Sequence, residues 1–195
     1  MRTDRLFKKL NAIHKMSESF IEALREELIW RELPRNFVLQ NDMSVATHLY
    51  YLDTGFAVAY RYREGKRVAG EFWRDGQFVV TFESFISQTR GDVQIRLAQP
   101  SDVLALSYKS LQELLSEYAD AQILYREIIT AHHIRLLKKM SEAHRQTTQE
   151  RYLELKQLHP DIELIVSQAA VASHIGVTPQ TLSRMKRLIR ARDNL

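Results

Sequence analysis

The spacing of hydrophobic and polar residues changes along the 195-residue chain, and each change marks a different structural element. In the first 30 or so residues, apolar side chains recur at helical spacing, for example at Phe20, Leu24 and Leu28. Ser19 and Glu22 have the spacing of a capping box. A Leu-Pro pair then ends the region. We therefore expect the chain to begin with helix.

Between Asn36 and Ser107 the pattern becomes that of short strands. Runs rich in β-branched and aromatic residues, among them H-L-Y-Y-L, F-A-V-A-Y-R-Y and V-L-A-L-S, are separated by the turn sequences D-T-G, R-E-G-K, R-D-G and Q-P-S. Turns at such close spacing are typical of a β-sandwich or barrel. The segment Y-R-E-G-K-R-V, with Gly65 in its turn, predicts a hairpin.

After Tyr108 helical spacing returns, and a stretch without glycine or proline runs from about Asp120 to Leu158. One apolar seam in it, with spacings of four and three residues, consists of Ile129, His133, Leu136, Met140 and Ala143. A second apolar face consists of Leu124, Ile128 and Leu137. A helix that is apolar on two sides needs two partners. We expect it to pack on the β-rich block and on a second copy of the chain, although a monomer that buries both faces is the alternative.

The segment V-A-S-H-I-G-V-T-P-Q-T-L-S-R-M-K-R, from Val171 to Arg187, has the pattern of two helices joined by a turn. Gly176 falls at the turn, where a left-handed backbone is needed. Thr178 can cap the second helix, with Pro179 at its first position, and Ser167 can cap the first. The side chains expected to pack between the helices are Val171, Ile175, Val177, Leu182 and Met185, with the small Ala172 at the crossing. The pattern predicts a helix-turn-helix, with an ordinary helical hairpin as the alternative.

The second of these helices has a polar and basic exposed face, which predicts DNA binding. The side chains able to reach base edges or phosphates from its N-terminal end are Gln180, Thr181, Ser183, Arg184 and Arg187. Gln180 is able to pair with adenine and Arg184 with guanine. The side chains better suited to phosphates are Ser167, Thr178, Lys186 and Arg187.

The distribution of charge favours the same interpretation. Residues 167–195 contain five basic residues and one acidic residue, whereas the rest of the chain is balanced, with 23 of each. A neutral body with a basic end is the layout expected when that end meets a polyanion. A solvated, frayed helix end is the alternative.

Composition excludes several other classes of protein. Cysteine is absent, so disulfides, thiolate zinc sites, cysteine-ligated iron–sulfur clusters and cysteine nucleophiles are excluded. The β-rich block holds one histidine, His48, too few for a cupin-type metal site, and the chain has neither a G-x-S-x-G elbow nor a glycine-rich phosphate loop. We therefore expect no enzyme and no metal. No segment predicts a membrane span or a signal peptide, and we expect a cytoplasmic protein.

The order of these elements resembles that of the CRP/FNR superfamily of transcription regulators. The segments L-P-R-N-F-V-L-Q-N-D, H-L-Y-Y-L-D-T-G-F-A-V-A-Y and E-G-K-R-V-A-G-E-F-W-R-D-G-Q-F-V resemble the strands and turns of its cyclic-nucleotide-binding barrel, and S-Y-K-S-L-Q-E-L-L the short helix that follows. R-Y-L-E-L and V-S-Q-A-A-V-A-S-H-I-G-V-T-P-Q-T-L-S-R are similar to regulators common in Bacteroidetes.

The resemblance implies an α+β fold in three parts. A cyclic-nucleotide-binding-like β-roll (a double-stranded β-helix), together with the N-terminal helix, would form a sensor domain over residues 1–118. A long dimerisation helix would cover residues 119–145, with Ile129, His133, Leu136 and Met140 in the dimer seam. A helix-turn-helix DNA-binding domain would cover residues 146–195, with the β-wing of many relatives missing or reduced.

The same resemblance allows the sensor to be compared with members that bind cyclic AMP. Those members carry a Gly-Glu pair after the D-G-x-F turn and, about ten residues later, an Arg-Ser or Arg-Thr pair. Here Val80-Thr81 and Gly91-Asp92 occupy those places, and Asp92 would oppose a phosphodiester. Arg90 is one residue away from the expected arginine. We therefore expect no cyclic-nucleotide binding.

Two alternatives for the sensor remain open: a core filled by its own side chains, and a pocket for an apolar or uncharged small effector. The candidate pocket residues are Phe72, Phe78, Val80, Thr81, Phe82, Arg90 and Asp92. No other cofactor is indicated.

The expected function is therefore a homodimeric regulator that binds an inverted repeat in double-stranded DNA. RNA polymerase would be a further partner of an activator, but no surface for it is identifiable. The alternative is a sensor-type module whose shortened helical domain binds a protein partner.

Overall fold

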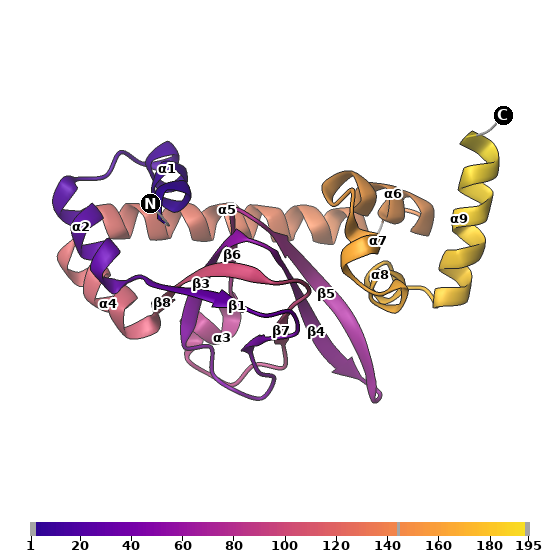
Figure 1. Cartoon of the computed structure of the whole chain (residues 1–195), viewed down its shortest axis with the longest axis horizontal. Helices are drawn as coiled ribbons and strands as arrows, with labels where there is room; N and C mark the ends of the chain where they lie inside the picture. Colours follow the sequence, from indigo (N-terminus) through magenta and orange to yellow (C-terminus); the bar gives the residue numbers. More distant parts are fainter. Residues whose placement is uncertain (1–2, 144, 194–195) are drawn as a thin grey trace.

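The computed structural model describes residues 3–143 and 145–193. In chain order it contains an N-terminal pair of helices, a β-roll, a long helix that runs alongside the roll and a C-terminal helical module (Figure 1). The N-terminal helices are α1 (Asp4–Ile13) and α2 (Glu18–Glu27). The capping box predicted at Ser19 is wrong, because the residue that caps α2 is Ser17, two positions earlier. The hydroxyl of Ser17 accepts the N–H of Phe20 at 3.4 Å and donates to Asp120 at 2.6 Å, a residue distant in sequence.

Within the described residues, the β-roll consists of two four-stranded sheets in which every pairing is antiparallel. The first has the order β1-β8-β3-β6 and the second β2-β7-β4-β5. The strands are β1 (Ile29–Leu33), β2 (Val38–Gln40), β3 (His48–Thr54), β4 (Phe56–Arg63), β5 (Lys66–Arg74), β6 (Gln77–Val79), β7 (Gln94–Leu97) and β8 (Ser101–Ser107). This is the β-rich block that the sequence predicts between residues 36 and 107. The sequence did not predict β1, which lies before that block and pairs with β8.

The predicted hairpin around Gly65 is confirmed as the connection between β4 and β5. Glu64 and Gly65 both have a positive φ, 50° and 73°, which is the left-handed conformation that a tight hairpin turn requires. The register runs from Arg63 opposite Lys66 to Phe56 opposite Arg74, with one irregularity. The hairpin projects from the roll beside the C-terminal module (Figure 1).

One short helix lies within the roll, and two further helices follow it. Helix α3 (Phe82–Ser87) lies between β6 and β7, and α4 (Tyr108–Glu117) leads directly into α5 (Ala119–Ala143), which runs along the molecule (Figure 1). The stretch up to Leu158 is not one helix. A second helix, α6 (Thr148–Leu158), starts with a capping box in which Thr147 and Glu150 satisfy each other's backbone N–H groups.

The C-terminal module is completed by three helices: α7 (Ile162–Ile165), α8 (Gln168–His174) and α9 (Pro179–Asp193). Buried apolar side chains form three clusters. One fills the inside of the roll, between the two sheets. A second lies between the first sheet and helices α1, α2, α4 and α5. The third joins the outer face of β4 and β5 to helices α6 to α9, so the C-terminal module shares a core with the roll.

No helix in residues 3–143 or 145–193 combines the length and the apolar character needed to cross a membrane.

Candidate DNA-binding surface and sensor pockets

Helices α8 and α9 form the predicted helix-turn-helix. Gly176, between them, has a φ of +80°, so the left-handed turn is confirmed. Both predicted caps are present as well: the hydroxyl of Ser167 accepts the N–H of Ala170 at 3.2 Å, and that of Thr178 accepts the N–H of Thr181 at 3.2 Å. The two helix starts and the turn are therefore fixed by local contacts.

The two helices are held at a defined angle by a small apolar core. Val171 and Leu182 are fully buried, and Ala172 and Ile175 are exposed by only 1%. Val177 and Met185 pack against the same cluster. These are the residues that the sequence places between the helices. Because the core fixes α9 against α8, the exposed side chains of α9 form one rigid surface.

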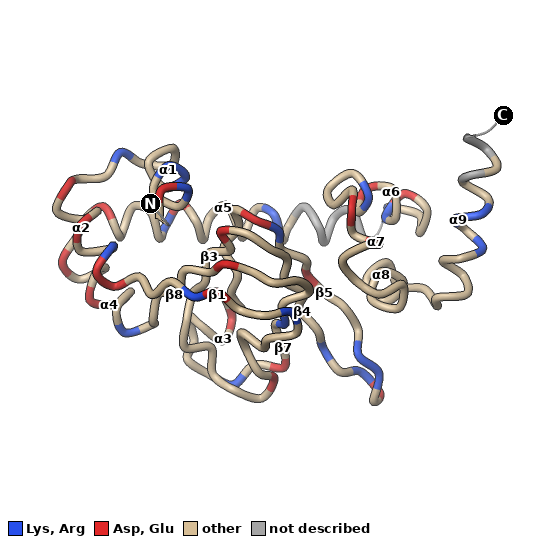
Figure 2. The backbone as a smooth tube through the Cα atoms, viewed as in Figure 1, with Lys and Arg blue, Asp and Glu red and all other residues tan. Residues whose placement is uncertain are grey.

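The exposed face of α9 carries the polar side chains predicted to contact DNA. Those that lie exposed on it are Gln180, Thr181, Ser183, Arg184 and Arg187. Ser167 and Thr178 are also exposed, at the N-terminal ends of α8 and α9. The structure therefore brings seven of the eight predicted DNA-contacting residues to the solvent side of the helix-turn-helix. In Figure 2 basic positions lie along the coloured part of α9.

Lys186, the eighth of these residues, has a partner within the chain. Its Nζ lies 2.6 Å from Oε1 of Glu163 in α7, and the same oxygen accepts the hydroxyl of Tyr152 at 3.1 Å. Burial alone would raise the pKa of Glu163. The hydrogen bonds from Lys186 and Tyr152, with the positive charges of Lys186 and Lys156, instead hold that pKa below its usual range. The ammonium group of Lys186 is thus already paired with a carboxylate within the chain.

Gln168 is a contributor that the sequence reasoning missed. From the first turn of α8, its Nε2 donates to Oγ of Ser183 at 2.6 Å and to the carbonyl of Pro179 at 3.1 Å. These bonds tie the N-terminal end of α9 to α8 and orient one of the predicted base-contacting hydroxyls. Glutamine at the first helical position is not by itself a signal for this contact.

The helix-turn-helix is docked on the β-roll through β5. Oγ of Ser173 accepts the backbone N–H of Ala69 at 3.0 Å, and the ring of His174 lies 4.5 Å from the ring of Phe72, centroid to centroid. The ring of His159, which follows α6, also lies edge-on to Phe56 and Phe72, at 5.3 and 6.0 Å. The position of the candidate DNA-binding surface therefore depends on β4 and β5.

The predicted effector-pocket residues fall in different places, and Phe72 and Arg90 lie apart from the others. Phe72 faces the C-terminal module, and Arg90 is exposed and forms an isolated bridge with Val45. Four of the seven, Val80, Thr81, Phe82 and Asp92, line a groove of about 490 Å³ between the roll and α5. Phe78 lines a separate apolar cavity, and Phe82 lies between the two.

Charged side chains in and beside the groove pair with each other. Nε of Arg61 lies 3.0 Å from Asp92, and Arg135, in α5, lies 2.9 Å from Glu71. Glu83 lines the groove as well. No ion pair of Glu83 is found among the described residues. The ring of Phe82, from the roll, lies against the ring of His132, from α5, with 4.2 Å between the centroids. The groove therefore has its cations matched by its own carboxylates.

The predicted dimer seam lies on a partly exposed side of α5. Ile129 is half-buried, whereas His133 and Leu136 are exposed and form part of the rim of the groove. The side chain of Met140 lies outside the described residues. Near the seam, Ile134 and Leu137 are 61% and 53% exposed. The C-terminal half of α5 thus presents large apolar side chains to solvent.

No cluster of three or more histidine, cysteine or acidic side chains able to hold a metal ion occurs in the described part of the chain. The sequence matches no family model and no curated protein.

Solved structures, in contrast, match over most of the chain. A candidate transcriptional regulator of the CRP/FNR family from Eubacterium rectale has a TM-score of 0.71 at 13% identity, with 91% of this chain and 85% of that chain covered. FixK2 from Bradyrhizobium japonicum has a TM-score of 0.67 at 18% identity, covering 85% and 86%. The c-di-GMP-responsive global regulator CLP of Xanthomonas campestris has a TM-score of 0.64 at 19% identity, covering 91% and 93%. The chain therefore has the fold of CRP/FNR-type transcriptional regulators: a cyclic-nucleotide-binding-like roll followed by a helix-turn-helix.

Proposed function

We propose that the protein is a transcription regulator that binds DNA through α9. The observation that carries this proposal is the exposed polar and basic face of α9, held rigidly on α8 by a buried core. A helix of this kind fits the major groove with its N-terminal residues against base edges. The fold, shared with regulators such as CLP, supports the same function.

Within this surface we assign different roles to different side chains. Gln180 and Arg184, one turn apart on the exposed side of α9, would read adenine and guanine. Thr181 and Ser183 would contact base edges or nearby phosphates. Ser167, Thr178 and Arg187 would contact phosphates and so fix the register without reading sequence. Lys186 would reach a phosphate only by leaving Glu163.

The exposed apolar face of α5 supports a homodimer. Ile134, Leu136 and Leu137 are large apolar side chains that are 40% exposed or more. Ile134 and Leu137 lie three residues apart and so share one side of the helix, and exposed apolar surface of this kind marks an interaction site. Pairing of two α5 helices would cover it and would set two copies of α9 side by side. Two recognition helices in successive major grooves lie about 34 Å apart, so the site would be an inverted repeat.

For the sensor, we propose that cyclic AMP is not the effector. The groove places Asp92 in an ion pair with Arg61, and two more carboxylates line it: Glu83, and Glu71, which pairs with Arg135. An anionic phosphodiester would have to displace Asp92 from Arg61 and lie beside these carboxylates, which is electrostatically unfavourable. Calorimetric titration with cyclic AMP should show no saturable heat, and a saturable isotherm would refute this part of the proposal.

The function is tested by selecting bound duplexes from a random DNA pool with the purified protein. We expect an inverted repeat with half-sites about one helical turn apart. The matched control is the Gln180→Ala/Arg184→Ala double variant, which leaves the buried core of the helix-turn-helix intact and should not recover that repeat. The same sequences recovered by the control, or no enrichment by the wild type with and without added cell metabolites, would contradict the proposal.

One observation favours the alternative of a protein partner. Leu188 on α9 is 63% exposed, and Leu164 in α7 is 85% exposed. Apolar side chains at these positions suit a protein surface better than a phosphate backbone. The substitution Leu188→Gln separates the two functions, because it should leave DNA binding unchanged if α9 reads DNA through its polar face.

A further inference from the structure

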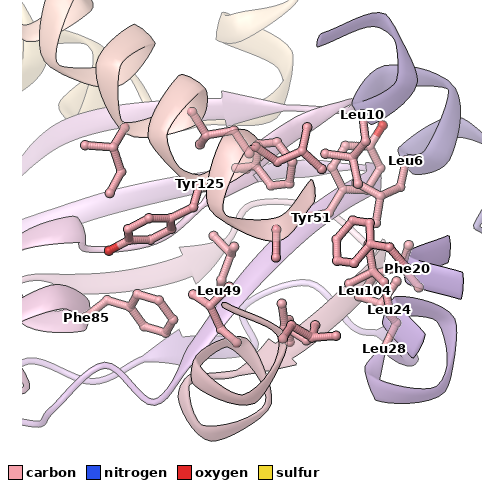
Figure 3. A pocket seen from close by; sticks show the side chains of 18 of the residues that line it. Leu6, Leu10, Phe20, Leu24, Leu28, Leu49, Tyr51, Phe85, Leu104 and Tyr125 are labelled. Atoms are coloured by element: carbon pink, nitrogen blue, oxygen red, sulfur yellow. The ribbon is translucent and has the colours of Figure 1, made fainter. Parts of the chain in front are cut away.

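A second hollow in the sensor lies on the other side of the first sheet from the interior of the roll. It is a cavity of about 80 Å³ between that sheet and helices α1, α2, α4 and α5 (Figure 3). Its walls come from parts of the chain far apart in sequence, among them Leu10, Phe20, Leu49, Phe85 and Leu124. It is distinct from the charged groove beside α5.

The lining makes the cavity unsuited to water. Among the described residues, every lining side chain is aliphatic or aromatic, and the only side-chain polar atoms are the hydroxyls of Tyr51 and Tyr125. The Tyr51 hydroxyl lies at the edge, beside Gly76, and burial is the main reason why the pKa of Tyr51 is raised. A buried water needs two to four polar partners, so this space offers too few.

We propose that this cavity is a binding site for a small, uncharged, apolar molecule. An engineered cavity of about 150 Å³ lined by leucine, isoleucine and phenylalanine stays dry and binds benzene or xenon. The cavity here has about half that volume and a lining of the same kind. It therefore suits a ligand of the size of a xenon atom, and its walls exclude anions, cations and sugars.

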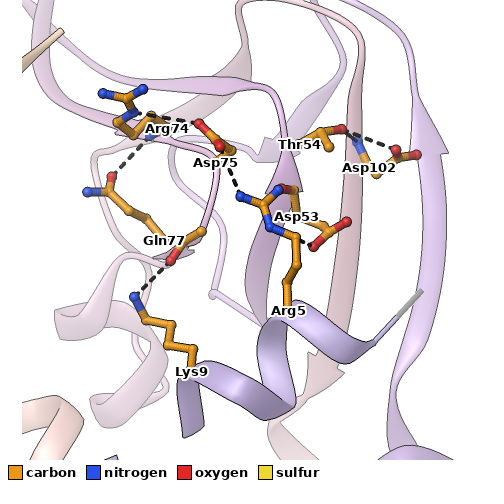
Figure 4. Close-up of polar contacts among 9 residues, drawn as sticks. Arg5, Lys9, Asp53, Thr54, Arg74, Asp75, Gln77 and Asp102 are labelled. Atoms are coloured by element: carbon orange, nitrogen blue, oxygen red, sulfur yellow. Dashed lines mark hydrogen bonds and ion pairs between the residues drawn. The ribbon is translucent and has the colours of Figure 1, made fainter. Parts of the chain in front are cut away.

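Helix α1 forms one wall of the cavity and is the part of the wall best placed to open. Leu6 and Leu10 line the cavity, while the other face of α1 is held by polar contacts. Nη2 of Arg5 donates to Asp75 at 3.0 Å, another Arg5 nitrogen donates to the carbonyl of Asp53, and Nζ of Lys9 donates to the carbonyl of Gly76 at 2.8 Å (Figure 4). The Arg5 and Asp75 side chains are 51% and 42% exposed, so this contact is in reach of solvent and breaks at low cost.

An occupant of the cavity would contact both the roll and α5. Phe78 and Phe85 line it from the roll side, and Leu124 and Ile128 from α5. Phe82 lines the cavity and also stacks on His132 of α5. Binding would therefore change the position of α5 relative to the roll. Any effect of this ligand on DNA binding rests on the function proposed above. Binding of the ligand to the cavity does not.

Xenon is the probe for the test, followed by its NMR chemical shift in titrations of the full chain. We expect a saturable shift for the wild type. Ala121 lines the cavity from α5, so Ala121→Leu should fill the space and abolish the saturable shift. The matched control is Ala131→Leu, the same substitution at an exposed position of the same helix, which should bind xenon as the wild type does.

If Ala121→Leu does not fold, as judged by circular dichroism, Leu10→Phe serves as the second filling variant, from α1 instead of α5. No saturable shift in the wild type overturns the proposal, and so does an equal shift in a folded cavity-filling variant. The selected DNA duplex is then titrated with and without xenon. A protein that takes up xenon but binds no duplex contradicts the proposed function alone, so the two failures are distinguishable.

Discussion

The ring of His174 lies against the ring of Phe72, with 4.5 Å between the centroids. His174 ends α8, the first helix of the helix-turn-helix, and Phe72 lies in β5 of the roll. Beside them, Ser173 accepts the backbone N–H of Ala69. Because the interface is both apolar and hydrogen-bonded, a displacement of β5 would be transmitted to α8, and through its core to α9.

Phe72→Ala should loosen the C-terminal module from the roll. Phe72 is 7% exposed and contacts the rings of Phe56, His159 and His174. Truncation of a buried phenylalanine to alanine costs about 3–5 kcal/mol. We expect a loss of this order in the free energy of unfolding measured by urea denaturation, with faster proteolysis between the roll and α6.

The control for this variant is Phe37→Ala, because Phe37 is 42% exposed. Its effect on the free energy of unfolding should be far smaller, within about 0.5 kcal/mol. Equal losses in the free energy of unfolding for the two variants would show that Phe72 does not join the C-terminal module to the roll.

The helix-turn-helix is the part of the fold that the sequence predicts best, because its determinants are local. Gly176, Thr178 and Pro179 act on the backbone within a few residues of themselves. The β4–β5 hairpin is predictable for the same reason, since Glu64 and Gly65 supply its turn. By contrast, β1 was missed because it is defined by pairing with β8, about 70 residues further along the chain.

The candidate sites were harder to predict because they depend on which face each side chain occupies. Phe72 and Trp73 are neighbours in sequence, yet Phe72 packs on the C-terminal module and Trp73 inside the roll. Side chains alternate between the two faces of a strand, so these two neighbours must point to opposite sides. Alternation does not determine which of the two points inward. The ion pair between Lys186 and Glu163 has no sequence signature, because the spacing of 23 residues is bridged only in the folded chain.

Arg184→Ala should weaken binding to the selected inverted repeat and relax one base position. A side chain that pairs with a base contributes about 1–3 kcal/mol, whereas loss of a phosphate contact weakens all sequences alike and reduces the salt slope by about one. Arg187→Ala is the comparison, because both arginines are exposed on α9. Fluorescence anisotropy with the repeat and its single-base variants at several salt concentrations measures both effects.

The control for the DNA-binding series is Lys8→Ala, which removes an exposed positive charge from α1 and should change nothing. Lys186→Ala is a poorer choice, since it also breaks the contact with Glu163. Wild-type affinity and sequence preference in both arginine variants would show that α9 does not read DNA.

Gly176→Ala should destabilise the helix-turn-helix through backbone strain alone. The φ of Gly176 is +80°, and an added methyl group would come no closer than 3.5 Å to a neighbour, Nη1 of Arg151. A left-handed backbone at a non-glycine residue costs about 1–2 kcal/mol. Gly70→Ala in β5 is the control, where glycine in a strand interior is less stable than alanine by about 0.5–1 kcal/mol. The midpoint temperature of thermal unfolding should therefore fall for Gly176→Ala and rise for Gly70→Ala. Shifts of the same sign in the two variants would contradict this expectation.

The contact between Lys186 and Glu163 should make the stability of the C-terminal module depend on pH. The pKa of Glu163 is held below its usual range in the folded state, because hydrogen bonds and positive charge outweigh burial. In the unfolded chain it should return to about 4.3. The stabilisation is therefore fully present above that pH and is lost as the pH falls through the lower folded value. Urea unfolding of the wild type and Glu163→Gln, measured from neutral pH downward through the unfolded-state pKa of about 4.3, should show a difference that shrinks on acidification. Lys186→Met should flatten the same dependence, and a difference that grows on acidification would mean that the pKa is raised instead.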